Sequence, residues 1–259
     1  MKFLHTLTVI AVGLGALGAA AQEREAAGKR HYGPEYAQRV FKGAGGGEFK
    51  YGWLAPAQPK AGEKYPLVIC LHGSGGNVRA SAVLARPDMR EKYPSFIVVG
   101  ECERPFVWAF TDVLGRRKMP ANPPEKLPVV IEAVRELLKT EAIDPNRVYI
   151  IGQSLGGAGS WGATARYPEL FAGAVPICGF WKVEDAPKMA TVPVWAFHGA
   201  DDPTVPVKFS RDLTAGVTKA GGMAKYTEYH GVGHDSWTKA CDEPGLWEWL
   251  FAQKKSLEK

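Results

Sequence analysis

The sequence has 259 residues, of which 46% are hydrophobic, 23% charged and 11% aromatic. This length suits one domain, and the composition excludes a disordered chain, a collagen-like fibre and a disulfide-rich miniprotein. The formal net charge of +5 at pH 7 would suit a nucleic acid or an anionic membrane surface. The positive charges are scattered, however, and the longest run is Arg116-Arg117-Lys118. We therefore expect no nucleic-acid partner, and at most an acidic substrate near this run.

The first 21 residues have the pattern of a secretory signal peptide. Lys2 gives a positive start, an apolar run extends over 7–17, and Ala19-Ala20-Ala21 offers a small-residue cleavage site before Gln22. The alternative, a membrane-spanning helix, needs about 20 apolar residues, more than this run provides. The sequence thus predicts a signal peptide over 1–21, cleavage near Ala21, one folded domain over 22–259, and a secreted or periplasmic protein without a stable membrane anchor.

Four cysteines follow the predicted cleavage point: Cys70, Cys102, Cys178 and Cys241. Export permits disulfides, yet Cys70 and Cys178 lie in apolar runs, where cysteine often packs as a small hydrophobic residue. We therefore predict no particular pairing. No spacing resembles a zinc site, and we expect neither a metal nor another cofactor.

Strand-like and helix-like segments alternate along the rest of the chain. Segments 37–42 and 48–54 flank a glycine cluster and predict a β-hairpin. Further strands, mostly continuous apolar runs, are predicted at 65–71, 95–100, 147–151, 172–178, 192–197 and 224–229. Helices are predicted at 124–140, 154–167, 207–220 and 244–255. This order predicts an α/β sheet of mostly parallel strands with helices on both faces, and 101–122 is a long loop without periodicity.

The strand predicted at 147–151 leads into Gly152-Gln153-Ser154-Leu155-Gly156, a G-x-S-x-G pattern that precedes a helix. A strand that turns into a helix within one residue leaves no space for side chains two positions before and after the turn. The serine then stands at the carboxyl end of the strand, beside a helix N-terminus that stabilises negative charge. The pattern predicts Ser154 as a nucleophile, with an ordinary glycine-rich turn as the alternative.

A second glycine-rich turn, His72-Gly73-Ser74-Gly75-Gly76, follows the strand predicted at 65–71. Acyl transfer needs backbone N–H groups aimed at the developing oxyanion, and turns of this kind supply them. We assign the two donors to the backbone N–H groups of Ser74 and Leu155, and expect a structural role for His72. The alternative is a phosphate-binding loop, but neither a G-K-[ST] nor a G-x-G-x-x-G pattern is present.

A serine nucleophile needs a histidine base and an acid that orients the base. In proteins with the G-x-S-x-G turn, the acid and then the histidine follow the serine in the chain. His198, His230 and His234 follow Ser154, and His234 is preferred because it lies in a glycine-flanked loop after the strand predicted at 224–229. Asp201 and Asp202 follow the strand predicted at 192–197, and both stay open as the acid.

Together these motifs resemble the α/β-hydrolase superfamily, and within it the small secreted serine esterases of the phospholipase/carboxylesterase-like branch, some regarded as peptidases. These are relatives of polyhydroxyalkanoate depolymerases and of feruloyl and acetylxylan esterases. The resemblance covers roughly 51–250 and also rests on Asp144-Pro145-Asn146-Arg147-Val148-Tyr149, Tyr167-Pro168-Glu169-Leu170-Phe171-Ala172 and Gly233-His234-Asp235-Ser236-Trp237. It implies a single-domain α/β-hydrolase fold with a mostly parallel sheet of about eight strands. The family's His-Gly-x-x-Asp-x-x-Val-Pro loop maps onto 198–206, which implies Asp202 as the acid.

The resemblance implies a serine hydrolase that cleaves small-molecule or polymer-linked carboxylic esters through an acyl-enzyme. One alternative is a peptidase of the prolyl-oligopeptidase type, although 22–259 leaves no room for that branch's extra domain. Another is a non-catalytic binding module, although such proteins commonly lose a member of the triad. Two regions differ from the family pattern, 100–103 with the following 106–119, and Phe180-Trp181, and both are expected to border the substrate. Trp108 and Trp181 are candidate pocket residues, with core packing as the alternative.

Overall fold

The computed structural model describes residues 31–76, 78–114 and 122–255, which all belong to one compact unit. The predicted signal peptide over 1–21 and the basic run Arg116-Arg117-Lys118 lie outside the described residues. Within the described part of the chain, no helix combines the length and the apolar character needed to cross a membrane.

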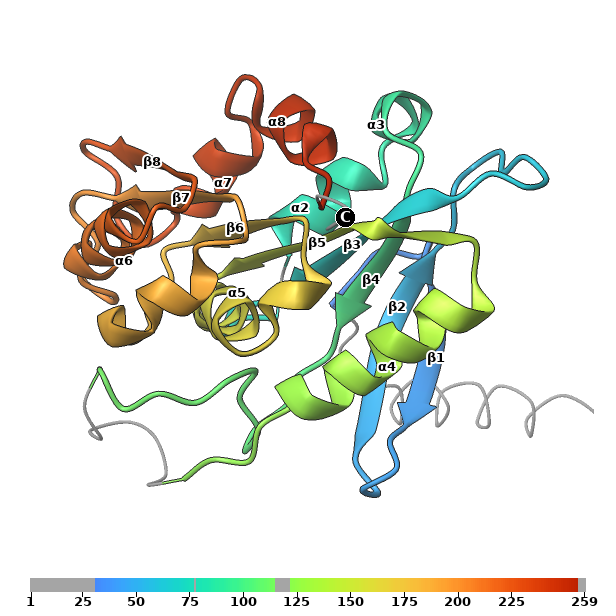
Figure 1. The fold of residues 1–259 in the computed structure, drawn as a ribbon, viewed down its shortest axis with the longest axis horizontal. Helices are drawn as coiled ribbons and strands as arrows, with labels where there is room; N and C mark the ends of the chain where they lie inside the picture. The colour runs from blue at the N-terminus through green and yellow to red at the C-terminus, as the bar shows by residue number, and fades with distance from the viewer. Residues whose placement is uncertain (1–30, 77, 115–121, 256–259) are drawn as a thin grey trace, which may run out of the picture. The chain divides into compact units, whose positions relative to one another are not determined.

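An eight-stranded sheet forms the centre of the fold, with the strand order β1-β2-β4-β3-β5-β6-β7-β8 (Figure 1). The pairs β1–β2 and β2–β4 are antiparallel, and every other neighbouring pair is parallel. The sheet predicted from the sequence is thereby confirmed. The strands are β1 (Ala37–Lys42), β2 (Glu48–Leu54), β3 (Tyr65–Leu71), β4 (Phe96–Gly100), β5 (Ile143–Gln153), β6 (Gly173–Ile177), β7 (Val194–Gly199) and β8 (Ala224–Tyr229).

The central strands are apolar throughout because both faces of the sheet are covered. All seven residues of β3 are buried. Leu67, Ile69 and Leu71 belong to the core cluster on one face, whereas Val68 and Cys70 belong to the cluster on the other. Successive side chains of a strand point to opposite faces, so a strand between two helical layers needs an apolar residue at every position.

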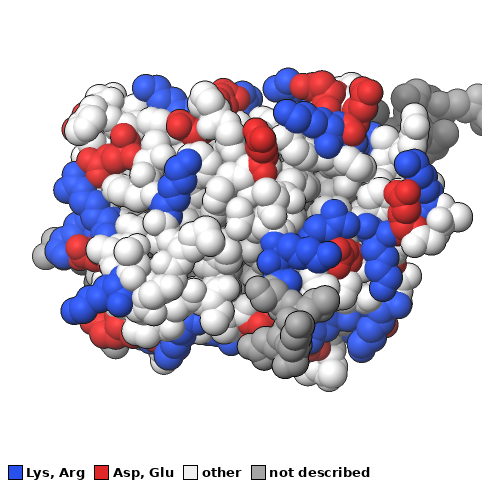
Figure 2. All heavy atoms as spheres, turned by 45° about the horizontal axis from the view of Figure 1, so that its top comes forward, with Lys and Arg blue, Asp and Glu red and all other residues white. Residues whose placement is uncertain are grey.

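Two layers of helices cover the sheet (Figure 1). One layer holds α4 (Leu127–Thr140), α5 (Leu155–Arg166) and α6 (Lys208–Lys219), together with the 3-10 helices η2 (Pro168–Leu170) and η3 (Val183–Met189). The other layer holds α2 (Arg79–Leu84), α3 (Pro87–Lys92), α7 (Ser236–Cys241) and α8 (Leu246–Ala252). Figure 2 shows basic and acidic side chains interspersed over the face where α3 and α8 lie.

The predicted helices form, and three short ones were not predicted. The helix expected from residue 124 begins at Leu127, because Glu125 pairs with Val107 in a parallel bridge and the N–H of Lys126 donates to the Val107 carbonyl at 2.8 Å. Each of α2, α3 and α7 has only six residues, less than two turns, and so carries no readable period.

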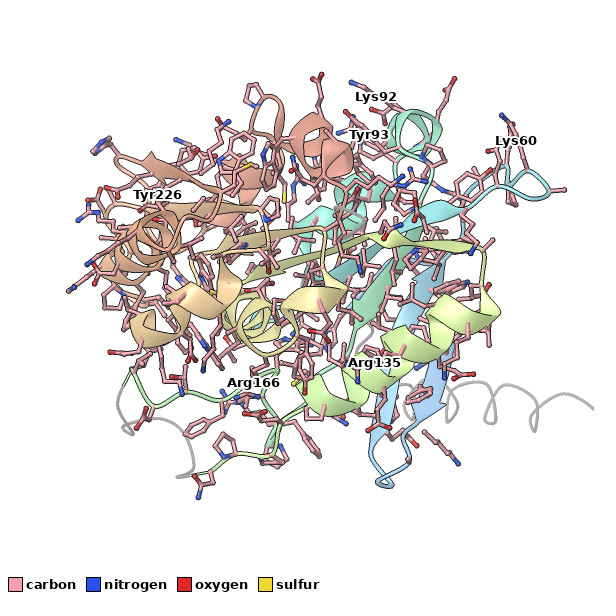
Figure 3. All side chains as sticks on the ribbon, viewed as in Figure 1. Lys60, Lys92, Tyr93, Arg135, Arg166 and Tyr226 are labelled. Carbon is pink, nitrogen blue, oxygen red and sulfur yellow. The ribbon has the colours of Figure 1, made fainter. Side chains whose placement is uncertain are left out.

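The long segment between β4 and α4 is fastened to α5. Arg166, labelled in Figure 3, extends from α5 to this segment, where it pairs with the carboxylate of Glu125 and donates to the carbonyl of Phe110 at 3.3 Å. The same carboxylate accepts from the Phe110 N–H at 2.7 Å. Glu125 therefore joins both described arms of the segment to the helix that follows the G-x-S-x-G turn.

Candidate active site

Ser154 stands at the junction of β5 and α5 in a strained backbone conformation. Its φ of 56° and ψ of −117° lie outside the regions that L-residues normally adopt. Among the described residues other than glycine, only Ser154 and Cys178 have a positive φ. The N–H of Ser154 donates to the Ile177 carbonyl at 2.9 Å, and its carbonyl accepts from the Ala158 N–H at 2.9 Å. These bonds to β6 and α5 hold the strained turn, a feature that clusters at functional sites.

The glycines of the pattern are required by close approach of the backbone. A β-carbon on Gly156 would lie 2.0 Å from the carbonyl oxygen of Leu71, at the end of β3. A β-carbon on Gly152 would lie 2.1 Å from the carbonyl oxygen of Gly156. Any larger residue would push α5 away from β3, and the physical reason given for the sequence pattern is confirmed.

Ser154, His234 and Asp202 form a chain of hydrogen bonds. Nε2 of His234 lies 2.9 Å from Oγ of Ser154, and Nδ1 of His234 lies 2.7 Å from Oδ2 of Asp202. A carboxylate only accepts hydrogen bonds, so the neutral imidazole carries its proton on Nδ1. The lone pair on Nε2 is then left facing the serine hydroxyl, where it can accept a proton.

The acid is buried and ionised. The side chain of Asp202 is 0% exposed, and its Oδ1 accepts from the backbone N–H groups of Thr204 at 2.8 Å and Val205 at 3.0 Å. Burial alone would raise the pKa of Asp202. The hydrogen bonds from His234 and from the two backbone N–H groups outweigh burial, so its pKa lies below the ordinary value. Asp202 rather than the exposed Asp201 contacts His234, as the family pattern implied.

The loops after β7 and β8 meet, and this contact positions His234. The N–H of Asp201 donates to the Val232 carbonyl at 3.0 Å, and a β-carbon on Gly199 would lie 2.2 Å from the Gly233 carbonyl oxygen. The ring of His234 also contacts the edge of Trp237, with 5.4 Å between the ring centroids. Backbone contact and aromatic packing therefore hold the histidine over the acid.

His72 supports the turn after β3. Its Nε2 accepts from the Cys102 N–H at 3.0 Å, its Nδ1 lies 2.6 Å from the Gly73 carbonyl oxygen, and its own carbonyl accepts from the Trp108 indole at 2.8 Å. Burial lowers the pKa of His72 to about 4, so the ring is neutral at pH 7. A β-carbon on Gly73 would lie 3.2 Å from Cβ of Ser154. The turn thus abuts the serine at Gly73, the residue before the proposed donor Ser74.

Trp108 and Trp181 are placed as core residues. Each is 1% exposed, and both belong to the larger core cluster on the side of α4 and α5. The indole N–H of Trp181 donates to Asp185 at 2.9 Å, as that of Trp108 does to the His72 carbonyl. Neither ring has an exposed face. Of the two alternatives that the sequence left open, the structure favours core packing.

A small apolar cluster adjoins the serine instead. It is separate from the two main cores and consists of Ala158, Phe180 and Val205, with the partly buried Val113, Leu155 and Phe209 against them. Leu155 directly follows Ser154, and Val205 donates its N–H to Asp202. Phe180 and Val113 belong to the two regions that were expected to border the substrate. Sequence reasoning missed this cluster, because it joins distant parts of the chain.

Two further side chains lie against Asp202. His198, which was considered as a base and set aside, has Nε2 at 3.2 Å from Oδ2 of Asp202. The side chain of Cys178 is the second: its sulfur, a carboxylate oxygen of Asp202 and a ring nitrogen of His234 all lie within 4.8 Å of one another. Burial raises the pKa of the Cys178 thiol to about 12, and all four cysteines are free thiols. The contact of His198 with Asp202 was also missed by the sequence analysis.

Comparison with known proteins agrees with this geometry. The chain is 36% identical to a structure described as a thermostable esterase, with a TM-score of 0.77 over 85% of this chain and 64% of that one. An acylaminoacyl peptidase from Pyrococcus horikoshii is 16% identical, with a TM-score of 0.66 over 87% of this chain and 43% of that one, and shares the fold.

Two curated proteins are similar in sequence. The "Putative esterase NocK" of Nocardia uniformis subsp. tsuyamanensis is 29% identical over 59% of this chain and 44% of that protein. An "Uncharacterized secreted protein" of Arthroderma benhamiae is 22% identical over 78% of this chain and 25% of that protein. The chain thus spans a quarter to under half of the length of these relatives.

The model of the family described as Phospholipase/Carboxylesterase matches residues 55–243, which include Ser154, Asp202 and His234. This match extends over most of the described domain, and it agrees with the eight-stranded sheet and the strained serine turn. The chain belongs to the phospholipase/carboxylesterase family of the α/β-hydrolase superfamily.

Proposed function

We propose that the protein is a serine carboxylesterase that hydrolyses carboxylic esters through an acyl-enzyme on Ser154. The observation that carries this proposal is the chain from Ser154 Oγ through His234 to the buried, ionised Asp202. Membership of a carboxylesterase family supports the type of bond that is cleaved.

The geometry supports a two-step reaction. Oγ of Ser154 attacks the ester carbonyl while its proton passes to Nε2 of His234, and the charge on the resulting imidazolium is balanced by Asp202. The carbonyl oxygen becomes an oxyanion, for which the N–H groups of Ser74 and Leu155 are the proposed donors. The bond from carbon to the alcohol oxygen then breaks, and His234 returns the proton to the departing alcohol.

Hydrolysis of the acyl-enzyme repeats these steps with water. His234 takes a proton from the water as it attacks the acyl carbon, and the proton goes back to Oγ of Ser154 when the bond between the acyl group and the serine breaks. The second step thus regenerates the free enzyme and releases a carboxylic acid. No metal or organic cofactor enters either step.

The apolar cluster beside the serine is the proposed acyl side of the site. Leu155 directly follows Ser154, Val205 bonds to Asp202, and Phe180 belongs to the same aliphatic and aromatic cluster. The substrates proposed are therefore esters of small molecules or of polymers whose acyl group fits this surface.

Export to the periplasm or the medium is proposed from the pattern over 1–21. The match to a fungal protein named as secreted supports the same location. Expression of the whole chain in a bacterium, followed by N-terminal sequencing of the exported product, is expected to find a start near Gln22. A product that keeps residues 1–21 would contradict the proposed cleavage.

One paired assay tests the function and separates it from the alternatives. p-Nitrophenyl acetate and the corresponding amide, acetyl p-nitroanilide, differ only in the bond that is cleaved. The wild type is expected to hydrolyse the ester far faster than the amide, and Ser154→Ala to lose the ester activity while keeping the circular dichroism spectrum of the wild type. Preferred cleavage of the amide would favour a peptidase, and absence of both activities would favour a binding module.

A further inference from the structure

His198 is a buried imidazole in contact with the proposed acid, and the reaction described above gives it no role. It lies on β7, and its side chain is 0% exposed. Nε2 lies 3.0 Å from the Val205 carbonyl oxygen and 3.2 Å from Oδ2 of Asp202. Nδ1 lies 2.7 Å from Oγ of Ser210, on α6. Each ring nitrogen therefore has a polar partner inside the protein.

The partners decide where the ring carries its proton. At Nε2 both neighbours, a carbonyl and a carboxylate, only accept hydrogen bonds, so Nε2 must be protonated. Burial lowers the pKa of His198, which keeps the ring neutral and leaves a lone pair on Nδ1. The hydroxyl of Ser210 donates to that lone pair. The two acceptors at Nε2 thus fix the tautomer, and the Ser210 hydroxyl satisfies the lone pair that remains on Nδ1.

The hydrogen bonds of Val205 connect His198 to the loop that carries Asp202. Val205 donates its N–H to Oδ1 of Asp202, and its carbonyl accepts from His198. Oδ2 of Asp202 lies between Nδ1 of His234 and Nε2 of His198, at 2.7 and 3.2 Å. Both carboxylate oxygens are therefore held, which fixes the direction in which Oδ2 meets His234.

We propose that His198 is a positioning residue for the acid of this esterase: its ring, bonded to Ser210 at Nδ1 and to the Val205 carbonyl at Nε2, holds the carboxylate of Asp202 against His234. The inference rests on the proposed function, because the acid matters only where His234 acts as a base. Neither His198 nor Ser210 is placed in contact with substrate, so the effect reaches the reaction only through Asp202.

Substitution of His198 tests the donor. His198→Leu removes the N–H at similar bulk, and kcat on p-nitrophenyl acetate is expected to fall roughly ten- to a hundredfold, as for other residues that orient a reacting group, with little change in KM. His198→Gln keeps a donor on a flexible chain and is expected to recover most of the loss. A folded His198→Leu variant with the kcat of the wild type, or a Gln variant no better than Leu, would overturn the proposal.

A double-mutant cycle separates positioning from ordinary packing. If His198 acts through the acid, His198→Leu has little further effect on kcat in a protein that already carries Asp202→Asn. Effects that multiply independently would contradict the proposal, because a purely structural loss does not depend on the carboxylate.

Two variants on α6 keep the proposal testable if His198→Leu does not fold. Ser210→Ala removes the hydroxyl that anchors Nδ1 of His198, whereas Thr214→Val removes a buried hydroxyl that bonds only to the helix backbone, at the Ser210 and Arg211 carbonyls. Ser210→Ala is expected to lower kcat several-fold and Thr214→Val to leave it unchanged. Equal effects of the two substitutions would overturn the role of Ser210.

A spectroscopic readout is independent of turnover. The proton between His234 and Asp202 is expected to give a low-field proton NMR resonance that broadens or shifts in Ser210→Ala and stays in place in Thr214→Val. A wild type with this resonance but without ester hydrolysis would refute the proposed function and leave the positioning role standing. An unchanged resonance in Ser210→Ala would refute the positioning role alone.

Discussion

Nε2 of His234 lies 2.9 Å from Oγ of Ser154, although the two residues are 80 positions apart in the chain. The sheet makes this possible, because β5, β7 and β8 run parallel and end at the same edge. The serine follows β5, the acid follows β7 and the histidine follows β8. A site assembled from strand ends in this way depends on the contacts between loops, and each of those contacts can be tested.

The choice between the two neighbouring aspartates gives a direct test of the acid. Asp202→Asn keeps the shape but removes the charge that holds the His234 tautomer, and kcat is expected to fall on the order of 10⁴-fold. Asp201→Asn is the matched control, because Asp201 is exposed and contributes its backbone N–H rather than its carboxylate. Ester hydrolysis by both variants checks this, and a severe loss in Asp201→Asn alone would reverse the assignment.

The close approach of α5 to β3 predicts which glycine is indispensable. Gly156→Ala would force a β-carbon to 2.0 Å from the Leu71 carbonyl, a backbone atom that cannot move aside, whereas Gly45 has open space around it and an ordinary φ. Overpacking typically costs 1–3 kcal/mol, so we expect Gly156→Ala to lose about 3 kcal/mol of unfolding free energy and most activity. Urea denaturation is the measurement. If Gly156→Ala were as stable as Gly45→Ala, α5 would not be pressed against β3.

Much of the fold was readable because burial on both faces leaves a local signal. The apolar runs of β3, β6 and β7 predicted strands whose bounds lie within two residues of those observed. The six-residue helices left no period to read. The order serine, aspartate, histidine was also predictable, since each follows a strand and bears a side chain suited to its expected role, whereas the choice of Asp202 over Asp201 came only from the family resemblance.

Contacts that form only when separate segments come together in the fold could not be predicted from the sequence. The N–H of His198 reaches Asp202 only because the acid loop turns back on β7, and the spacing alone suggested that this histidine was too near to act. Val113 packs against the cluster that contains Phe180, a residue from a distant part of the chain. Aromatic residues in the sequence also do not tell which side they face, and the buried Trp108 and Trp181 rings each keep a hydrogen bond for the indole N–H, to the His72 carbonyl and to Asp185.

The apolar cluster predicts the acyl-length preference of the enzyme. Phe180 is 4% exposed and occupies space beside Leu155. Phe180→Ala is expected to open room for longer acyl chains, so that the ratio of kcat/KM for p-nitrophenyl octanoate to that for the acetate rises about tenfold, within the range for filling an apolar pocket. Phe41→Ala on β1, at the edge of the sheet, is the control. The same change of ratio in both variants would contradict an acyl site at Phe180.

The low pKa of His72 predicts a pH dependence of stability. The pKa of His72 is about 4 in the folded protein, whereas in the unfolded chain the ring has its ordinary pKa of 6.5. The unfolded state therefore binds more protons between these values, so the unfolding free energy falls as the pH drops from 6.5 to 4. In His72→Gln, which does not titrate, this part of the slope should disappear. Urea denaturation at several pH values checks it, and an equal slope in both proteins would contradict a neutral, buried His72.

The central claim is that Ser154 is the nucleophile of an esterase, and covalent labelling tests it most directly. A fluorophosphonate reacts with an activated serine hydroxyl, and tandem mass spectrometry locates the adduct. We predict one adduct per chain, on the peptide that contains Ser154, with ester hydrolysis lost in proportion to labelling and no adduct in Ser154→Ala or His234→Asn. Full hydrolysis by a protein that is not labelled at Ser154 would contradict the claim.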